Sequence, residues 1–188
     1  MPDTARPGAR ADRLTAPLAD GVAHLEPLGE SHREPLRAAC AADPAIWDIY
    51  PVSYAGAGFD PAFDALTDTA GRVPFAALAG GVLVGMTGYL NIAGKHRVLE
   101  IGGTYLAPAA RGSGLNRRFK QLLIDHAFAC GFHRIEFRID ARNARSQAAV
   151  EKLGARREGV LRDHMITWTG HVRDTVVFAI LQREWAAR

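Results

Sequence analysis

The sequence predicts a single α/β (α+β) domain, with a mixed, mostly antiparallel sheet of about seven strands and helices on both faces. The chain has 188 residues, enough for one domain with a substantial core. Apolar residues alternate with period two in several short segments and recur every three to four residues in others. Hairpins precede a strand–helix–strand crossover, and this combination gives a sheet with strands of both directions.

The strands are expected where apolar and polar residues alternate between turn residues. These segments are residues 22–28, 75–79, 82–90, 98–106, 133–139, 158–168 and 172–181. Gly80 and Gly81 form a strong hairpin signal between the second and third of them. Thr169 and Gly170 mark the turn between the last two.

The helices are expected where the apolar period lengthens and end signals flank it. They cover residues 32–41, 61–70, about 115–130 and 143–153, with a short aromatic helix over 44–51. Ser31 and Glu34 fit a capping box before the first helix, and Asp60 is expected to cap the second. Gly131 and Gly154 are natural ends for the later two.

The composition and the two ends of the sequence are those expected of an ordinary globular protein. Residues 16–188 are expected to form the domain and residues 1–15 a disordered tail. No apolar run is long enough to cross a bilayer and no secretion signal is evident, so we expect a cytoplasmic protein without a membrane partner, as a monomer or homodimer. Cys40 and Cys130 lack metal-ligand spacing and are expected to be buried and reduced, so no metal is predicted.

Positive charge is concentrated in the second half of the chain, although the net charge is only +3. Residues 111–162 contain twelve lysines and arginines and five acidic residues, a net charge of +7. The remaining segments contain eleven basic and fifteen acidic residues, a net charge of −4. This distribution favours a polyanionic ligand. Nucleic acid is the weaker choice, because no combined aromatic and basic binding motif is present.

A glycine-containing loop, Arg111-Gly-Ser-Gly114-Leu-Asn116, joins the strand over 98–106 to the next helix. Gly112 and Gly114 permit positive φ, so successive N–H groups can point at one site. The helix N-terminus adds unpaired donors and partial positive charge, which suits a phosphate group. The loop lacks the lysine of a Walker motif and the third glycine of a dinucleotide fingerprint.

The loop and two neighbouring segments resemble the GNAT superfamily of acyl-CoA-dependent N-acyltransferases. The family loop is Gln/Arg-x-x-Gly-x-Gly/Ala, and Asn116 replaces its final residue. Residues 143–154, Asn-Ala-Arg-Ser-Gln-Ala-Ala-Val-Glu-Lys-Leu-Gly, resemble its second motif, with Val150 where the family often has tyrosine. Residues 100–108 resemble the corresponding strand of the RimJ/RimL-like branch, the ribosomal-protein N-terminal acetyltransferases.

This resemblance implies an acetyl-CoA-dependent N-acetyltransferase with the GNAT fold. The loop would bind the pyrophosphate, the strand backbone would pair with the pantetheine amides, and a backbone N–H there would polarise the thioester carbonyl. The implied acetyl-CoA contacts are Thr104, Tyr105, Leu106, Arg111, Gly112, Ser113, Gly114, Leu115, Asn116, Arg117, Asn143 and Ser146.

The same resemblance implies two proton-handling groups. Glu100 is the leading general base for the acceptor ammonium, with His164, Asp163 and Asp174 as alternatives. The tyrosine that protonates the thiolate in many members is absent here, so Ser146, one helical turn earlier, is the hydroxyl expected to approach the sulfur. The branch can carry a glutamate near position 165, where this chain has methionine.

The acceptor is expected to be a primary amine, either a protein N-terminus or a small molecule. Its site would be formed by the N-terminal helices and the last hairpin, with Tyr89 and Tyr105 as further cleft residues. An aromatic mouth is expected from Trp47, Tyr50, Tyr54, Phe59 and Trp168. The alternative function is a non-catalytic acyl-CoA-binding sensor or interaction module, motivated by Val150.

Overall fold

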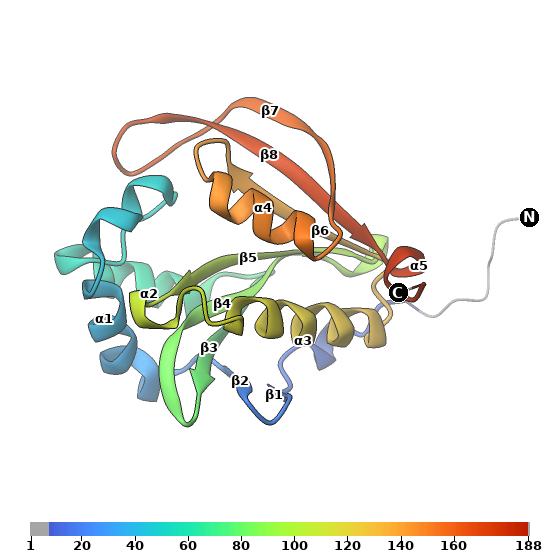
Figure 1. The fold of residues 1–188 in the computed structure, drawn as a ribbon, viewed down its shortest axis with the longest axis horizontal. Helices are drawn as coiled ribbons and strands as arrows, with labels where there is room; N and C mark the ends of the chain where they lie inside the picture. Colours follow the sequence, from blue (N-terminus) through green and yellow to red (C-terminus); the bar gives the residue numbers. More distant parts are fainter. Residues whose placement is uncertain (1–7, 188) are drawn as a thin grey trace, which may run out of the picture.

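The computed structural model describes residues 8–187, which form one twisted, eight-stranded sheet in the order β1-β2-β3-β4-β5-β6-β8-β7 (Figure 1). The strands are β1 (Leu18–Ala19), β2 (Ala23–Pro27), β3 (Val73–Ala79), β4 (Val82–Ala93), β5 (Val98–Leu106), β6 (Arg134–Asp140), β7 (Arg156–Ile166) and β8 (Val172–Leu181). Neighbouring strands are antiparallel except β5 and β6, which are parallel. The predicted mixed, mostly antiparallel sheet is confirmed. The prediction missed β1, a two-residue strand too short to show a period.

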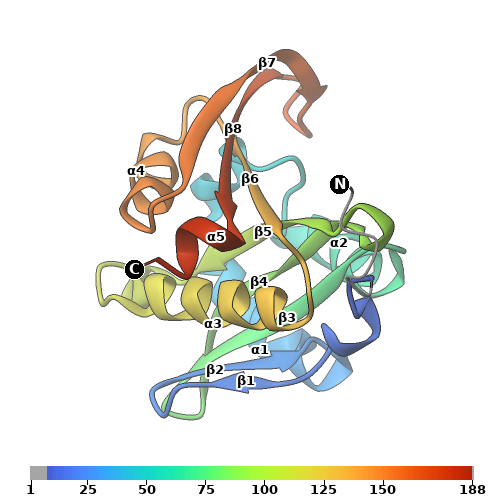
Figure 2. The ribbon, with the colours of Figure 1, turned by 90° about the vertical axis from the view of Figure 1, so that its right-hand side faces the viewer.

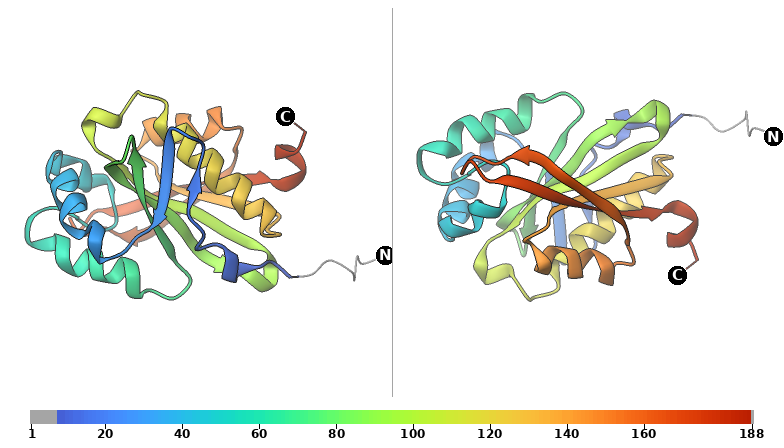
Figure 3. Two further views of the ribbon diagram at one scale, coloured as in Figure 1. Left: turned by 90° about the horizontal axis from the view of Figure 1, so that it is seen from below. Right: turned by 90° about the horizontal axis from the view of Figure 1, so that it is seen from above.

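Helices cover both faces of this sheet, as predicted. They are α1 (Arg33–Ala41), α2 (Phe59–Asp68), α3 (Leu115–Ala129), α4 (Ala144–Lys152) and α5 (Gln182–Trp185). Short 3₁₀ helices are η1 (Ala11–Arg13), η2 (Glu30–His32), η3 (Pro44–Ile49), η4 (Gly56–Gly58), η5 (Gly94–His96) and η6 (Pro108–Ala110). Helices α3 and α4 lie on one face and α2 on the other (Figure 2). Seen from above, the β7–β8 hairpin extends over the sheet toward the segment that contains η3 (Figure 3).

Two apolar cores lie on opposite faces of the sheet. The larger core packs α3 against the central strands through residues such as Phe119 and Leu123. The smaller core surrounds Trp47, whose ring centroid lies 4.7 Å from that of Tyr105 on β5. Because both faces of the central strands are buried, β5 is held from each side.

The ends of the first two helices differ from the prediction. The Gly29 N–H donates to His32 Nδ1 at 3.1 Å, and Glu34 pairs with Arg37, so the Ser31–Glu34 capping box is wrong. Asp60 lies inside the first turn of α2 and accepts from Arg37 at 2.7 Å, so it is no cap either. Arg37 of α1 holds both carboxylates instead, and its ion pair with Asp60 joins the two helices, which local spacing could not show.

Other turn predictions are confirmed by backbone geometry. The glycines of the β3–β4 turn, Gly80 and Gly81, both have positive φ, as do Gly131 and Gly154 after α3 and α4. Asn143 caps α4, with its Oδ1 accepting from the Ser146 N–H at 3.0 Å. These positions were predictable because the signal and its effect lie within a few residues of each other.

The N-terminal segment packs on the domain earlier than expected. Residues 1–7 of the predicted tail lie outside the described part of the chain. Within residues 8–15, Leu14 is fully buried and the Arg10 N–H donates to the Cys130 carbonyl at 2.8 Å. The packed chain therefore begins before residue 16. Cys40 and Cys130 are both free and buried, as predicted.

Substituting Gly85 tests the close packing of β4 on β5. Its φ is +157°, and an added Cβ would collide with the Tyr105 carbonyl and press on Leu106. We expect Gly85→Ala to lower the free energy of unfolding by about 3 kcal/mol in urea denaturation. Gly29→Ala is the matched control, since nothing lies within 4 Å of the position that its added methyl group would occupy and its φ is negative. Equal stability of the two variants would contradict this packing.

Candidate active site

The parallel pairing of β5 and β6 stops after three residue pairs, and this opening is the centre of the candidate site. The pairs run from Val98 with Arg134 to Glu100 with Glu136. Beyond Glu100, β5 remains paired with β4, whereas β6 remains paired with β8. Backbone groups that lose a ladder partner need water or a ligand in its place. The opening therefore offers a binding edge inside the sheet, between the strands that precede and follow α3.

A bulge in β5 lies beside this opening. The register shifts between Met86 and Gly88 of β4, opposite Gly103, whose φ is +58°. The next residue, Thr104, is held from both faces: its hydroxyl lies 2.8 Å from Thr87 Oγ1, and its carbonyl accepts from the Tyr50 hydroxyl at 2.6 Å. The position of the β5 backbone at the opening is thus fixed by neighbouring segments that include β4 and the residue that ends η3.

The predicted contacts Tyr105 and Leu106 present their side chains to the two cores. Tyr105 is 1% exposed and donates its hydroxyl hydrogen to the Ala39 carbonyl at 2.6 Å, while Leu106 packs in the larger core. Their side chains are therefore turned away from the opening, so any contact there would be made by the backbone, which is the role that the family resemblance implies for them.

The glycine loop forms a concave array of donors at the start of α3. Gly112 and Gly114 both have positive φ, at +78° and +85°. Among the described residues, no acceptor is found for the N–H groups of Gly112, Ser113, Gly114 and Asn116. Ser113 Oγ donates to the Ala110 carbonyl at 2.7 Å and receives the Leu115 N–H at 3.4 Å. Such an array at a helix N-terminus binds anions.

Arg111 differs from the expectation that its side chain reaches an anion in this loop. Its Nε donates to the Leu106 carbonyl at 2.8 Å, and its Nη1 pairs with Asp43 Oδ2 at 2.5 Å. The guanidinium therefore fastens the end of β5 to the segment before η3. Arg117 is exposed and has no ion pair within residues 8–187, so its guanidinium is free to meet an anion.

The second motif places Asn143 and Ser146 in the first turn of α4. Asn143 Oδ1 is occupied by the helix cap, whereas the half-buried Ser146 hydroxyl has no hydrogen-bond partner in the described part of the chain. Val150, one turn further on, is 3% exposed and belongs to the larger core. Valine thus fills space where a tyrosine would supply a hydroxyl.

Glu100 is a buried carboxylate at the last paired position before the opening. It is 7% exposed, and its Oε2 accepts from Asn91 Nδ2 at 2.7 Å and lies 3.7 Å from Arg138 Nε. Burial raises the pKa of Glu100, and the Asn91 hydrogen bond and Arg138 offset only part of this effect. A carboxylate of raised pKa in an opening suits general-base chemistry.

Comparison with known proteins decides the family. Residues 23–156 match the model of the acetyltransferase (GNAT) domain. The chain belongs to the GNAT acetyltransferase family. A probable acetyltransferase (GNAT family) from Chromobacterium violaceum ATCC 12472 has a structure similar to this GNAT domain, with a TM-score of 0.88 and 29% identity over 95% of this chain and 97% of the other.

Two further solved structures are similar to the GNAT domain. RimJ from Mycobacterium smegmatis, in complex with CoA-disulfide, has a TM-score of 0.78 and 25% identity over 90% of this chain and 87% of the other. The spermidine N-acetyltransferase from Vibrio cholerae, in complex with CoA and spermine, shares the fold, with a TM-score of 0.73 and 18% identity over 89% of this chain and 99% of the other.

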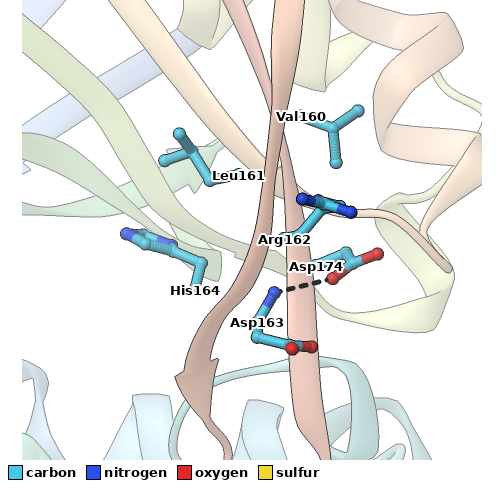
Figure 4. Close-up of a pocket in the computed structure, with 6 residues that line it drawn as sticks. All are labelled: Val160, Leu161, Arg162, Asp163, His164 and Asp174. Carbon is cyan, nitrogen blue, oxygen red and sulfur yellow. Dashed lines mark hydrogen bonds between the residues drawn. The ribbon is translucent and has the colours of Figure 1, made fainter.

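The alternative bases lie in the β7 bulge of the GNAT domain, where the β7–β8 register shifts between Leu161 and Met165. The Asp163 N–H donates to Asp174 Oδ1 at 2.9 Å, and Asp163 has a φ of +48°. Both carboxylates and His164 line an open hollow beside the hairpin, with His164 on the other side of β7 from Asp174 (Figure 4). His164 Nδ1 lies 3.0 Å from Thr175 Oγ1. Asp163 and Asp174, two of the three alternative bases, therefore help to form the bulge in β7.

The predicted aromatic mouth is mostly core. Trp47, Tyr54 and Phe59 are buried in the smaller core, because η3, α2 and the intervening loop fold over that face. Tyr50 is half-buried and reaches β5. Trp168 alone of the five is largely exposed, and its Nε1 donates to the Trp47 carbonyl at 2.8 Å, which docks the β7–β8 turn on η3. Tyr89, predicted as a cleft residue, is also buried.

Lys120 is the residue of this region that the sequence reasoning missed. It is 5% exposed on α3, and its Nζ contacts Thr104 Oγ1. A signal was present in the sequence, since Lys120 shares a helical face with the buried Ile124 and Ala127. A lysine at such a position can either extend its amine to solvent or be buried, and only packing distinguishes the two.

Within residues 8–187, no helix is long and apolar enough to span a membrane. The same part of the chain contains no group of three or more histidine, cysteine or acidic residues placed to hold a metal ion.

The raised pKa of Glu100 predicts a pH-dependent stability difference. Ionised Glu100 opposes folding, so stability is lost as pH rises through its folded-state pKa, and Glu100→Gln relieves this. At pH 8 we expect the free energy of unfolding of the variant to exceed that of the unmodified protein by on the order of 1 kcal/mol, and at pH 4 we expect no difference. Urea unfolding at both pH values measures this.

Glu158→Gln is the control of opposite sign. Hydrogen bonding from Arg134 lowers the pKa of Glu158, so its contribution is present at pH 8 and is lost on acidification. We expect this variant to be the less stable one at pH 8. If both variants were more stable than the unmodified protein at pH 8, or if neither were, the assigned environment of Glu100 would be contradicted.

Proposed function

We propose that this GNAT domain transfers the acetyl group of acetyl-CoA directly to the nitrogen of a primary amine. The observation that carries the proposal is the separation of β5 from β6 beside a glycine loop with free N–H groups. The open strand edge suits an extended ligand chain that carries amides, and the N–H groups of the loop suit a pyrophosphate. The RimJ structure that binds CoA-disulfide supports the same donor for this chain.

The residues present fit acetyl-CoA as the acyl donor. The N–H groups of Gly112, Ser113 and Gly114, with those of Leu115 and Asn116 at the helix start, would hold the pyrophosphate, and Arg117 would add charge. Within residues 8–187 the buried Asn116 Oδ1 has no hydrogen-bond partner, and because it is an acceptor it would need a donor group of the ligand rather than the pyrophosphate. The backbone of residues 104–106 would pair with the pantetheine amides, while Arg111 holds the strand end in position.

Glu100 and Ser146 would divide the proton chemistry of the transfer. Glu100 would take a proton from the acceptor ammonium, so that the neutral amine can attack the acetyl carbon. Its raised pKa makes it a better base than an exposed carboxylate. The unpartnered Ser146 hydroxyl on α4 would donate a hydrogen bond to the sulfur from the face opposite the acceptor.

For the acceptor we propose a protein or peptide N-terminal amine, as in the RimJ/RimL-like branch. Charges on the sheet near Glu100 are paired: Arg138 with Glu136 at 3.1 Å, and Arg173 with Asp140 at 3.8 Å. A polyamine needs several unpaired carboxylates, whereas the two carboxylates of β6 near Glu100, Glu136 and Asp140, are both in ion pairs. A peptide backbone needs both hydrogen-bond donors and hydrogen-bond acceptors. A small-molecule amine is the rival acceptor.

A non-catalytic acyl-CoA sensor is the second candidate, because buried Val150 supplies no proton to the leaving thiolate. Release of free CoA thiol that depends on an added amine distinguishes the two. The test panel contains peptides, polyamines and aminoglycosides, with mass spectrometry locating the acetyl group. Acetyl-CoA binding without turnover on any of them would favour the sensor.

Gly114→Glu tests the loop as the donor site. A carboxylate at this position would place negative charge and bulk among the N–H groups, so we expect at least about a hundredfold loss of acetyl-CoA affinity in calorimetry. Gly170→Glu is matched in substitution, in positive φ (+82°) and in open surroundings, but lies in the β7–β8 turn. Unchanged affinity of the Gly114 variant, or equal losses in both, would refute the loop assignment.

Glu100→Gln and Ser146→Ala test the two proton roles in the thiol-release assay. Removing the base should lower kcat/KM by about a hundredfold and abolish its decline on acidification. Ser146→Ala should lower kcat by about tenfold with little change in KM for acetyl-CoA. Ser31→Ala, an exposed serine on η2, should leave both parameters unaltered. An unaltered rate in either test variant would remove that residue from the mechanism.

A further inference from the structure

Lys120 lies beneath the opening between β5 and β6. Its Nζ contacts Thr104 Oγ1 on β5, lies 3.4 Å from Thr87 Oγ1 on β4, and is 5.8 Å from the centroid of the Phe137 ring on β6. The amine is therefore near both strands that border the opening, at the level of Thr104. Glu100 lies on the same strand, four residues earlier.

The surroundings of Lys120 are unusual for a buried cation. Among residues 8–187, no carboxylate lies within ion-pair distance of its Nζ. Within residues 8–187, Glu100 is the charged group that acts on its pKa, and the neighbours from β4, β5 and β6 are two threonines and a phenylalanine. Burial lowers the pKa of Lys120 to about 7, and Glu100 opposes this shift only in part.

Stability does not account for a lysine at this position. The two threonine hydroxyls are already 2.8 Å apart and can hydrogen-bond to each other. An unbranched apolar side chain would thus leave neither of them unpaired, and it would remove the cost of desolvating an amine. A buried lysine without a carboxylate is instead a common feature of functional sites.

The transfer reaction needs an acid on this face. When the acceptor nitrogen bonds to the acetyl carbon, the carbon–sulfur bond breaks and its electron pair stays on the sulfur. A serine hydroxyl is a far weaker acid than a thiol, so Ser146 can donate a hydrogen bond or relay a proton but cannot supply one outright. Val150 has no proton to give.

We propose that Lys120 is a catalytic residue whose ammonium donates a hydrogen bond and then a proton to the departing sulfur of the acyl donor. This inference rests on the proposed function. Two of its three N–H groups face the threonine hydroxyls, and the third is available. Lys120 becomes neutral when the sulfur becomes a thiol, and it regains a proton from water. The acceptor ammonium loses two protons to solvent, one of them through Glu100, so the protons balance.

The test measures how the sulfur of CoA behaves when bound, without turnover. The difference in affinity between CoA and desulfo-CoA reports the contact between the sulfur and the Lys120 ammonium. Because burial lowers the pKa of Lys120 to about 7, we expect this difference to be larger at pH 6, where the amine is protonated, than at pH 8, where it is mostly neutral, and Lys120→Met to remove the pH dependence. Calorimetry should show about a tenfold loss of CoA affinity in Lys120→Met, as for one charge-assisted hydrogen bond, and less than about a twofold loss for desulfo-CoA.

Lys95→Met is the matched control. Because Lys95 is exposed on η5, its replacement should change the affinity for neither CoA nor desulfo-CoA. Equal losses for CoA and desulfo-CoA would mean that Lys120 only fastens α3 to β5, and would overturn the proposal. If Lys120→Met does not fold, the unmodified protein still decides, because a ratio of CoA affinity to desulfo-CoA affinity that is the same at pH 6 and pH 8 excludes an ammonium of lowered pKa at the sulfur. Absence of CoA binding by the unmodified protein would instead refute the proposed function.

Discussion

The loss of pairing between β5 and β6 after Glu100 is the constraint on which the site depends. A parallel sheet interior normally leaves no backbone group without a partner, so strands separate only where other contacts hold them apart. Here the bulge at Gly103 redirects β5, and Thr104 is held by Thr87 and Lys120 on one face and by Tyr50 on the other. Contacts from both faces of the sheet therefore hold the opening in place.

Two buried ionisable groups on opposite faces of one strand give this opening its chemical character. Desolvation raises the pKa of Glu100 and lowers that of Lys120, so burial brings a weak acid and a weak base toward the same range. A proton can then leave on one side of β5 and be supplied on the other without a large mismatch in acidity. Neither shift arises from the residue type alone, because each requires that the central strands be covered on both faces.

The glycine loop depends on contacts that lie far from it in sequence. Arg111 connects the end of β5 to Asp43, so the loop is fastened to the segment before η3. The helix η3, which follows this segment, contacts the β7–β8 turn through the hydrogen bond from Trp168 to the Trp47 carbonyl. Elements on the proposed donor and acceptor sides are thus mechanically linked, although they are far apart along the chain.

The sequence alone determined the features that depend on neighbouring residues. Period-two segments, the glycine turns and the order of the motifs predicted the mixed sheet, its helices and the family, because each signal acts within one element. Tertiary packing decided the rest: Arg111 pairs with Asp43, Asp60 with Arg37, and the aromatic residues around Trp47 form a core. It also buried Lys120 and Glu100 and opened the sheet beside them. Competition among distant partners, and the desolvation that follows from covering both faces, are properties of the folded chain that no local spacing contains.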